Sequence, residues 1–123
     1  MIKFDQKTPI YQQLADSIRQ DILSGALKEG EPIPSVRQIS VDYELNPQTV
    51  LNATQLLIQE GLLEKRRGLG MFVIKSAQKQ LNSAASERFR SETIQSLVNE
   101  ARLLDISRKE LIDLIAKQYG EDK

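Results

Sequence analysis

The sequence predicts a mainly α-helical fold with one small β-hairpin, and three observations carry this prediction. Signals that start helices recur along the 123 residues, at Thr8-Pro9, Ser35, Asn46-Pro47 and Ser107. Apolar side chains follow these signals at intervals of three or four residues, which is the period of a helix with one buried face. Residues 62–74 break this pattern, because two short apolar runs there flank a basic loop that contains glycine.

The first helix is expected to begin at Thr8-Pro9 and to end before Gly25. Threonine would be the N-cap and proline the first helical residue, because the N–H that proline lacks is lost there without cost. Apolar residues then recur every four positions, at Ile10, Leu14, Ile18 and Ile22. Gly25 stands where a left-handed C-terminal cap is expected. One face of this helix should therefore be buried.

Two further helices are expected to follow, joined by a turn of two or three residues. Ser35 and Gln38 form a capping-box pattern, and the helix that they start should end near residues 43–44. The dipeptide Asn46-Pro47 then repeats the combination of cap and proline, and the helix after it should stop at Gly61. Two helices joined so closely are typical of a helix-turn-helix.

A β-hairpin with a basic tip is expected over residues 62–74. The order of helix, helix, short turn, helix and hairpin is the layout of a winged helix-turn-helix. The chain then becomes rich in Ser, Ala, Gln and Asn over residues 75–86. We place a boundary there, between a winged helix-turn-helix domain at 1–76 and a helical part at 77–123, although the same residues could start a long helix.

The C-terminal part is expected to form two amphipathic helices. Apolar residues between Phe89 and Leu104 approximate a helical period, and Ser107 with Glu110 forms another capping box. Two helices of this size cannot bury their apolar stripes alone. They must pack on the first domain, on a second copy of themselves, or on both.

The composition excludes several classes of function. Cys and His are both absent, which removes thiol nucleophiles, imidazole bases and the usual zinc ligands, so we expect no metal and no cofactor. An enzyme is not expected either, because paired carboxylates in apolar settings and a phosphate-cradling glycine loop are missing. With no apolar stretch long enough to span a membrane, the sequence predicts a cytoplasmic protein.

The 17 basic and 17 acidic residues are unevenly distributed. Residues 1–64 hold 5 basic and 9 acidic residues, residues 65–86 hold 5 basic and no acidic residue, and residues 87–123 hold 7 basic and 8 acidic residues. A polyanion responds to the local potential rather than to the net charge. The middle segment therefore favours contact with nucleic acid.

Several motifs occur in a fixed order: Pro9–Leu14, Leu27–Ile39, Asn46–Val50, Glu60–Leu63 and Arg67–Val73. Together they closely resemble the DNA-binding domain of the GntR family of bacterial transcriptional regulators, over residues 9–74. The short remainder looks like the YtrA subfamily, whose C-terminal part is a helical dimerisation element. The resemblance implies a homodimeric repressor that binds a pseudo-palindromic, double-stranded DNA operator. A small-molecule effector stays unknown, because no segment is large enough for a closed ligand domain.

The predicted DNA-binding residues lie at two helix starts and in the hairpin. Gln48 and Thr49 are candidates for reading bases, with Asn46 beside them, because the N-terminal residues of a helix in the major groove reach base edges. The resemblance implies a DNA contact by Arg37, with Ser35 beside it at a helix N-terminus suited to phosphate. Asn46 and Ser35 are also helix caps, so each has a structural as well as a functional interpretation.

The hairpin tip supplies the other predicted contacts, Arg66, Arg67, Gly68 and Gly70. Arginine can enter a narrow minor groove, and glycine lets the backbone approach DNA closely. The two glycines could equally serve the turn alone. Phe72, by contrast, is expected to be a core residue rather than a stacking platform.

The recognition helix departs from the family pattern. Where many members of the family have an arginine, this chain has Leu51 and Asn52, and no basic residue occurs between Leu45 and Glu64. This absence favours a second hypothesis, a winged helix used for protein contacts only. The basic hairpin tip favours DNA, so DNA binding is the leading hypothesis.

Overall fold

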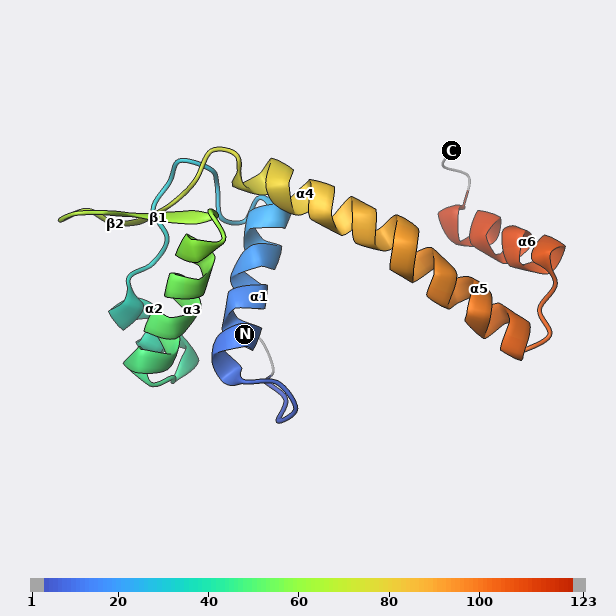
Figure 1. Cartoon of the computed structure of the whole chain (residues 1–123), viewed down its shortest axis with the longest axis horizontal. Helices are drawn as coiled ribbons and strands as arrows, with labels where there is room; N and C mark the ends of the chain where they lie inside the picture. The colour runs from blue at the N-terminus through green and yellow to red at the C-terminus, as the bar shows by residue number, and fades with distance from the viewer. Residues whose placement is uncertain (1–3, 121–123) are drawn as a thin grey trace. The chain divides into compact units, whose positions relative to one another are not determined.

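The computed structural model describes residues 4–120 and has the predicted mainly helical fold with one hairpin (Figure 1). Contacts divide the chain into two compact units, Met1–Ser83 and Ala84–Lys123. Within residues 4–120, no helix has the length and apolarity needed to cross a membrane. The elements are α1 (Ile10–Ser24), α2 (Val36–Tyr43), α3 (Pro47–Gln59), β1 (Leu63–Arg66), β2 (Gly70–Val73), α4 (Ala77–Arg88), the π-helical segment η1 (Phe89–Thr93), α5 (Ile94–Leu103) and α6 (Arg108–Tyr119).

Helix α1 begins one residue later than expected. Pro9 occupies the N-cap position with an extended ψ of 139°, and no side chain caps the helix, so the prediction of Thr8 as the cap was wrong. The preceding loop is held from within the helix instead, because Gln13 Nε2 donates to the carbonyl oxygens of Thr8 (2.6 Å) and Asp5 (2.9 Å). The other end agrees with expectation, since Gly25 is left-handed with φ of 87°.

Helices α2 and α3 form the predicted helix-turn-helix. Ser35 Oγ accepts a hydrogen bond from the backbone N–H of Gln38 (3.1 Å), and Asn46 Oδ1 accepts one from the backbone N–H of Gln48 (2.8 Å). Glu44 ends α2 in the left-handed conformation, at φ of 54°. Both side-chain caps were therefore predicted correctly, and together they set the short turn between the helices.

The core of the first unit lies between α1, α3 and the hairpin. Helices α1 and α3 run side by side (Figure 1), and α2 packs across α3. The buried apolar residues of this core are Leu14, Ala15, Ile18, Ile22, Ile33, Ile39, Val50, Ala53, Leu57, Leu62, Leu63, Met71, Val73 and Ala77. Because all three helices and both strands contribute to this core, α3 and the hairpin are held on a common scaffold.

Residues 31–33 pair with the hairpin, a contact that was not expected from the sequence. Strands β1 and β2 pair in antiparallel register from Leu63 with Val73 to Arg66 with Gly70. On the other side of β2, the N–H of Ile33 donates to the carbonyl of Met71 (2.9 Å), and the N–H of Val73 donates to the carbonyl of Glu31 (3.0 Å). The proline-rich segment before α2 therefore covers the free edge of β2.

Helix α4 begins inside the first unit. Ala77 is completely buried in the core, and the N–H of Gln78 donates to Glu29 Oε2 over 3.1 Å. Residues 75–86 thus start a helix, which was the alternative to a linker, and helical backbone continues through η1 into α5. The contacts divide the chain after Ser83, later than the expected boundary after residue 76, because the first turns of α4 pack on the core.

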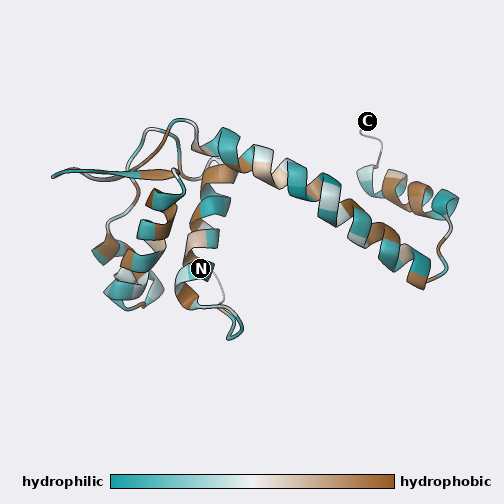
Figure 2. Cartoon of the chain, in the orientation of Figure 1, coloured by the Kyte–Doolittle hydropathy of each residue, from teal (hydrophilic) through white to brown (hydrophobic). Residues whose placement is uncertain are grey.

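The second unit consists of helices with little buried surface. Ser107 Oγ accepts a hydrogen bond from the N–H of Glu110 (3.1 Å), which confirms the predicted start of α6. Within residues 84–120, Ala101 is the single buried residue. Figure 2 shows hydrophobic residues on both α5 and α6. This unit leaves most of its apolar side chains in solvent.

Candidate nucleic-acid interface

The start of α3 presents amide side chains to solvent. Asn46 and Gln48 are exposed, whereas Thr49 is half-buried. Gln48 Nε2 donates a hydrogen bond to Asn52 Oδ1 over 2.9 Å, so the side chain of Gln48 is tied to a residue one turn further along the helix. The positive end of the helix dipole and these amides together form a surface suited to a polyanion with hydrogen-bonding edges.

The start of α2 contributes Ser35 and Arg37, and it lies near residues 51–58 of α3 rather than near the start of that helix. The hydroxyl of Ser35 is already used as a helix cap, so what this position offers to an anion is chiefly the free backbone N–H groups of the first turn. Arg37 is exposed in that first turn. Within the described residues 4–120, Arg37 takes part in no ion pair, which leaves its charge available to a ligand.

A hollow of about 290 Å³ joins α2, α3 and the hairpin. It brings together two of the predicted residues, Ser35 and Gly70, which lie 35 positions apart in the sequence. Lys65 and Gln55 also line it, and neither was selected from the sequence. The full lining is Ser35, Val36, Leu51, Thr54, Gln55, Ile58, Lys65, Gly70 and Met71.

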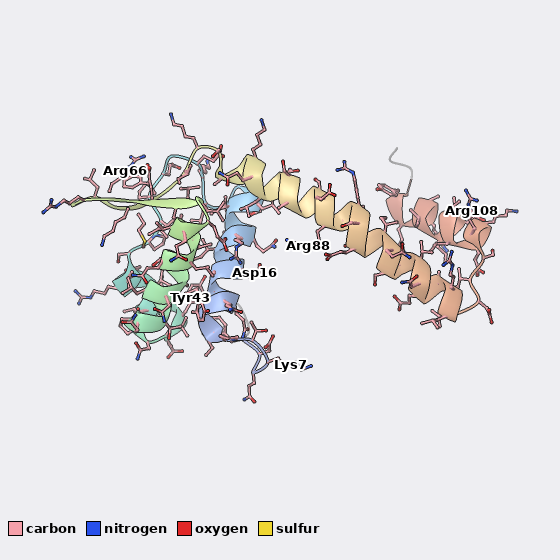
Figure 3. All side chains as sticks on the ribbon, viewed as in Figure 1. Lys7, Asp16, Tyr43, Arg66, Arg88 and Arg108 are labelled. Carbon is pink, nitrogen blue, oxygen red and sulfur yellow. The ribbon has the colours of Figure 1, made fainter. Side chains whose placement is uncertain are left out.

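The two faces of the hairpin carry different charges. Side chains alternate along a strand, so Lys65 and Arg66 point to opposite faces. Lys65 lines the hollow. On the opposite, outer face, the guanidinium of Arg66, which is labelled in Figure 3, binds Glu64 Oε1 over 2.8 Å and stacks 4.0 Å from the centre of the Phe72 ring. The expectation that Phe72 is a core residue was wrong, because its half-buried ring lies under Arg66, outside the core cluster.

The tip of the hairpin is a three-residue turn, Arg67-Gly68-Leu69. Gly68 has φ of 76° and Gly70 has φ of 104°, a region that L side chains rarely adopt. A Cβ added at either glycine would meet nothing within 4 Å, so the backbone conformation, not close packing, requires glycine there. Arg67 is exposed, and Leu69 is 70% exposed. The tip therefore offers one cation and one apolar side chain to a ligand.

The predicted residues therefore fall into four groups. Asn46, Gln48 and Thr49 meet at the start of α3, and Ser35 and Gly70 meet in the hollow. The remaining ones are Arg37, Arg67 and Gly68, which lie at the exposed edges of the surface, and Arg66, which is engaged on the outer face of the hairpin. Within residues 4–120, no group of three or more acidic side chains is placed to hold a metal ion.

Comparisons with known proteins agree with this geometry. The family described as bacterial regulatory proteins, gntR family, matches residues 10–73. The chain is 30% identical over 124 residues to the HTH-type transcriptional repressor YtrA of Bacillus subtilis, and the match covers 99% of this chain and 94% of YtrA.

Solved structures share the fold. A GntR family transcriptional regulator from Listeria monocytogenes superposes with a TM-score of 0.75 at 25% identity, over 93% of this chain and 98% of that one. The AraR DNA-binding domain, solved in complex with operator ORX1, superposes with a TM-score of 0.56 at 24% identity, over 59% of this chain and 94% of that one. The second match therefore concerns the fold of the first unit.

Proposed function

Because the chain belongs to the gntR family of bacterial regulatory proteins, we propose that it represses transcription as a homodimer on a pseudo-palindromic operator, in the cytoplasm. The chain is a transcriptional regulator of the GntR type, not an enzyme. Repression is proposed because YtrA, which matches nearly the whole chain, carries the name of a repressor.

The exposed start of α3 is the observation that supports DNA binding best. We propose that α3 enters the major groove, where Gln48 and Thr49 read bases and Asn46 lies against the backbone. Ser35 and Arg37 at the start of α2 then face phosphates, together with Lys65 and Gly70 in the hollow. Arg67 and Gly68 follow the adjacent minor groove.

The dimer is supported by the second unit, whose apolar residues need a partner. Leu97, Ala101, Leu111, Leu114 and Ile115 line an apolar groove of about 290 Å³ between α5 and α6. Burying such surface is the main favourable contribution to association. Two-fold symmetry then requires two half-sites about one helical turn apart, or a multiple of that.

A binding titration tests the proposal. Duplexes recovered from a randomised library are compared with a duplex of random sequence, at several salt concentrations. We expect the recovered duplexes to bind about 10³-fold more tightly. We also expect the affinity to fall steadily as salt is raised. The reason is that basic side chains of the bound protein displace counterions from the phosphates, and added salt opposes this displacement. Equal affinity for both duplexes, or affinity that is indifferent to salt, would contradict DNA recognition.

A second candidate function is a protein-contact module. Two observations favour it: α3 contains no Lys or Arg, and Arg66 forms an ion pair with Glu64. Under this alternative, the same titration shows no preference for any duplex. Replacing Lys65 and Arg67 by alanine would also leave binding to DNA unchanged, whereas DNA recognition requires a uniform loss and a shallower salt dependence.

A further inference from the structure

We propose that Asn52 is a further base-reading residue of α3, beside Gln48 and Thr49, and that it works as one unit with Gln48, an inference that rests on the proposed DNA binding. Both side chains are exposed, and Gln48 Nε2 donates to Asn52 Oδ1 over 2.9 Å. Residues four positions apart share one face of a helix. The two amides therefore form one continuous polar surface near the end of α3 that faces DNA.

Amide side chains are the groups of α3 best suited to contact base edges, because this helix contains no charged side chain. Between Pro47 and Gln59 there is no Lys or Arg, so the common bidentate contact from arginine to guanine is unavailable. Val50 and Ala53 are buried in the core, and Leu51 and Thr49 are half-buried. Gln48 and Asn52 are thus the exposed polar side chains in the first two turns of α3.

The hydrogen bond between the two amides decides what each offers to a base. Gln48 uses one N–H for Asn52 and keeps its other N–H and its Oε1, which complement the N7 acceptor and N6 donor of adenine. Asn52 accepts through Oδ1 and keeps both N–H groups of Nδ2 as donors. These donors match an acceptor edge, which guanine offers at N7 and O6 and thymine at O4.

Gln48 and Asn52 together therefore specify two neighbouring base pairs, with adenine facing Gln48 and guanine or thymine facing Asn52. It also orients Gln48 before DNA arrives. Immobilising one long side chain on binding reduces affinity by a factor of roughly two to ten. Asn52 removes much of this cost for Gln48, so its loss should weaken discrimination at a base that Asn52 does not itself contact.

Selection from a library of duplexes with randomised positions tests this inference on the full chain. The wild type is compared with Asn52→Ala, Asn52→Asp and the matched control Gln59→Ala, an exposed amide at the far end of α3. The recovered duplex is then varied one base pair at a time, and dissociation constants are measured at one salt concentration. Ratios between bases, not absolute affinities, are compared, because an added carboxylate is repelled by every phosphate.

For the wild type and for Gln59→Ala we expect a preference for adenine of about tenfold or more at one position. Asn52→Ala should lower this preference roughly two- to tenfold, and should abolish the preference at the neighbouring position. Asn52→Asp should keep the adenine preference, because a carboxylate still accepts from Gln48 Nε2. At the neighbouring position it should favour cytosine, whose N4 is a donor.

Two results would overturn the inference, and they differ in what they leave standing. If the wild type selects a sequence but Asn52→Ala has the base preferences of Gln59→Ala, Asn52 is not a reader, and DNA recognition by the chain stands. If the wild type enriches no sequence at all, the proposed function itself is wrong, and the role of Asn52 fails with it.

Discussion

The two units of the chain differ in how they bury apolar side chains. In the first unit, α1, α2, α3 and the hairpin enclose a shared core in which Leu14, Val50 and Leu57 are completely buried. In the second unit, large apolar residues stay open to solvent, including Leu103 at 85% and Tyr119 at 67% exposure. The first unit has the core of an independently folding domain, whereas the second needs a partner surface to complete one.

The largest effect is expected from opening a cavity in the first unit. Leu57→Ala should lower the free energy of unfolding by about 3 kcal/mol, because the surrounding core cannot collapse fully around the missing methyl groups. Leu103→Ala removes the same atoms from an exposed site of the second unit and should change stability by less than about 0.5 kcal/mol. Chemical denaturation measures both. Equal losses would contradict the contrast between the two units.

A charge in the apolar groove tests the partner surface of the second unit. Ile115→Asp should weaken the proposed homodimer by roughly tenfold to a hundredfold, because a carboxylate would replace an apolar side chain in the seam. Lys109→Asp puts the same group elsewhere on α6, outside the groove lining, and serves as the control. Sedimentation over a range of concentrations gives the dissociation constants. A dimer unaffected by Ile115→Asp would place the seam elsewhere.

Charges of the hairpin are expected to have a smaller and purely DNA-linked effect. Arg67→Ala should lower affinity about tenfold for every duplex, and reduce the slope of affinity against salt by about 0.9 if one phosphate contact is lost. The combined change Glu64→Ala and Arg66→Ala removes a neutral ion pair and should alter affinity less than about threefold. Fluorescence anisotropy measures both. A larger loss in the double variant would mean that the outer face of the hairpin touches DNA.

The smallest effect is expected from the cap of α3. Asn46→Ala should lower the free energy of unfolding by about 1 kcal/mol, because the N–H of Gln48 loses its side-chain acceptor. Ser107→Ala removes the equivalent cap from α6, in the second unit. Its effect should be visible at protein concentrations that favour the dimer and smaller after dilution. Thermal melts at two concentrations separate these cases, and a Ser107→Ala effect independent of concentration would argue against dimer-coupled folding of α6.

Local signals explain why most of the fold could be predicted. Ser35, Asn46 and Ser107 each cap a helix through a hydrogen bond to a backbone N–H two or three residues away, so the neighbouring sequence is sufficient to place these starts. Gly25 ends α1 for an equally local reason, its positive φ. Contacts between distant segments were missed. One example is the pairing of Glu31 and Ile33 with β2, because Pro32 and Pro34 made this segment look like a simple turn.

The candidate site was harder to predict because it depends on strand faces. Arg66 was predicted as a DNA contact in a segment without acidic residues, yet that segment begins directly after Glu64, and Glu64 is the residue that binds Arg66. Lys65 was counted in the basic segment but not selected, although alternation along β1 turns it into the hollow. Asn52 was noted as a missing arginine, and its bond to Gln48 became evident from side-chain geometry.

The π-helical turn between α4 and α5 has a consequence for engineering. A π turn accommodates one more residue than the α-helical turns on either side of it. Deleting a single residue such as Ser91 would let Phe89–Thr93 relax to α-helical geometry. Side chains after the deletion would then keep nearly their present positions around the helix axis, because the wide turn already takes up the extra residue. Phe89–Thr93 is therefore the part of this long helical stretch where the loss of one residue should be tolerated best, because the deletion removes a wide turn and keeps the hydrogen-bonded helix on either side.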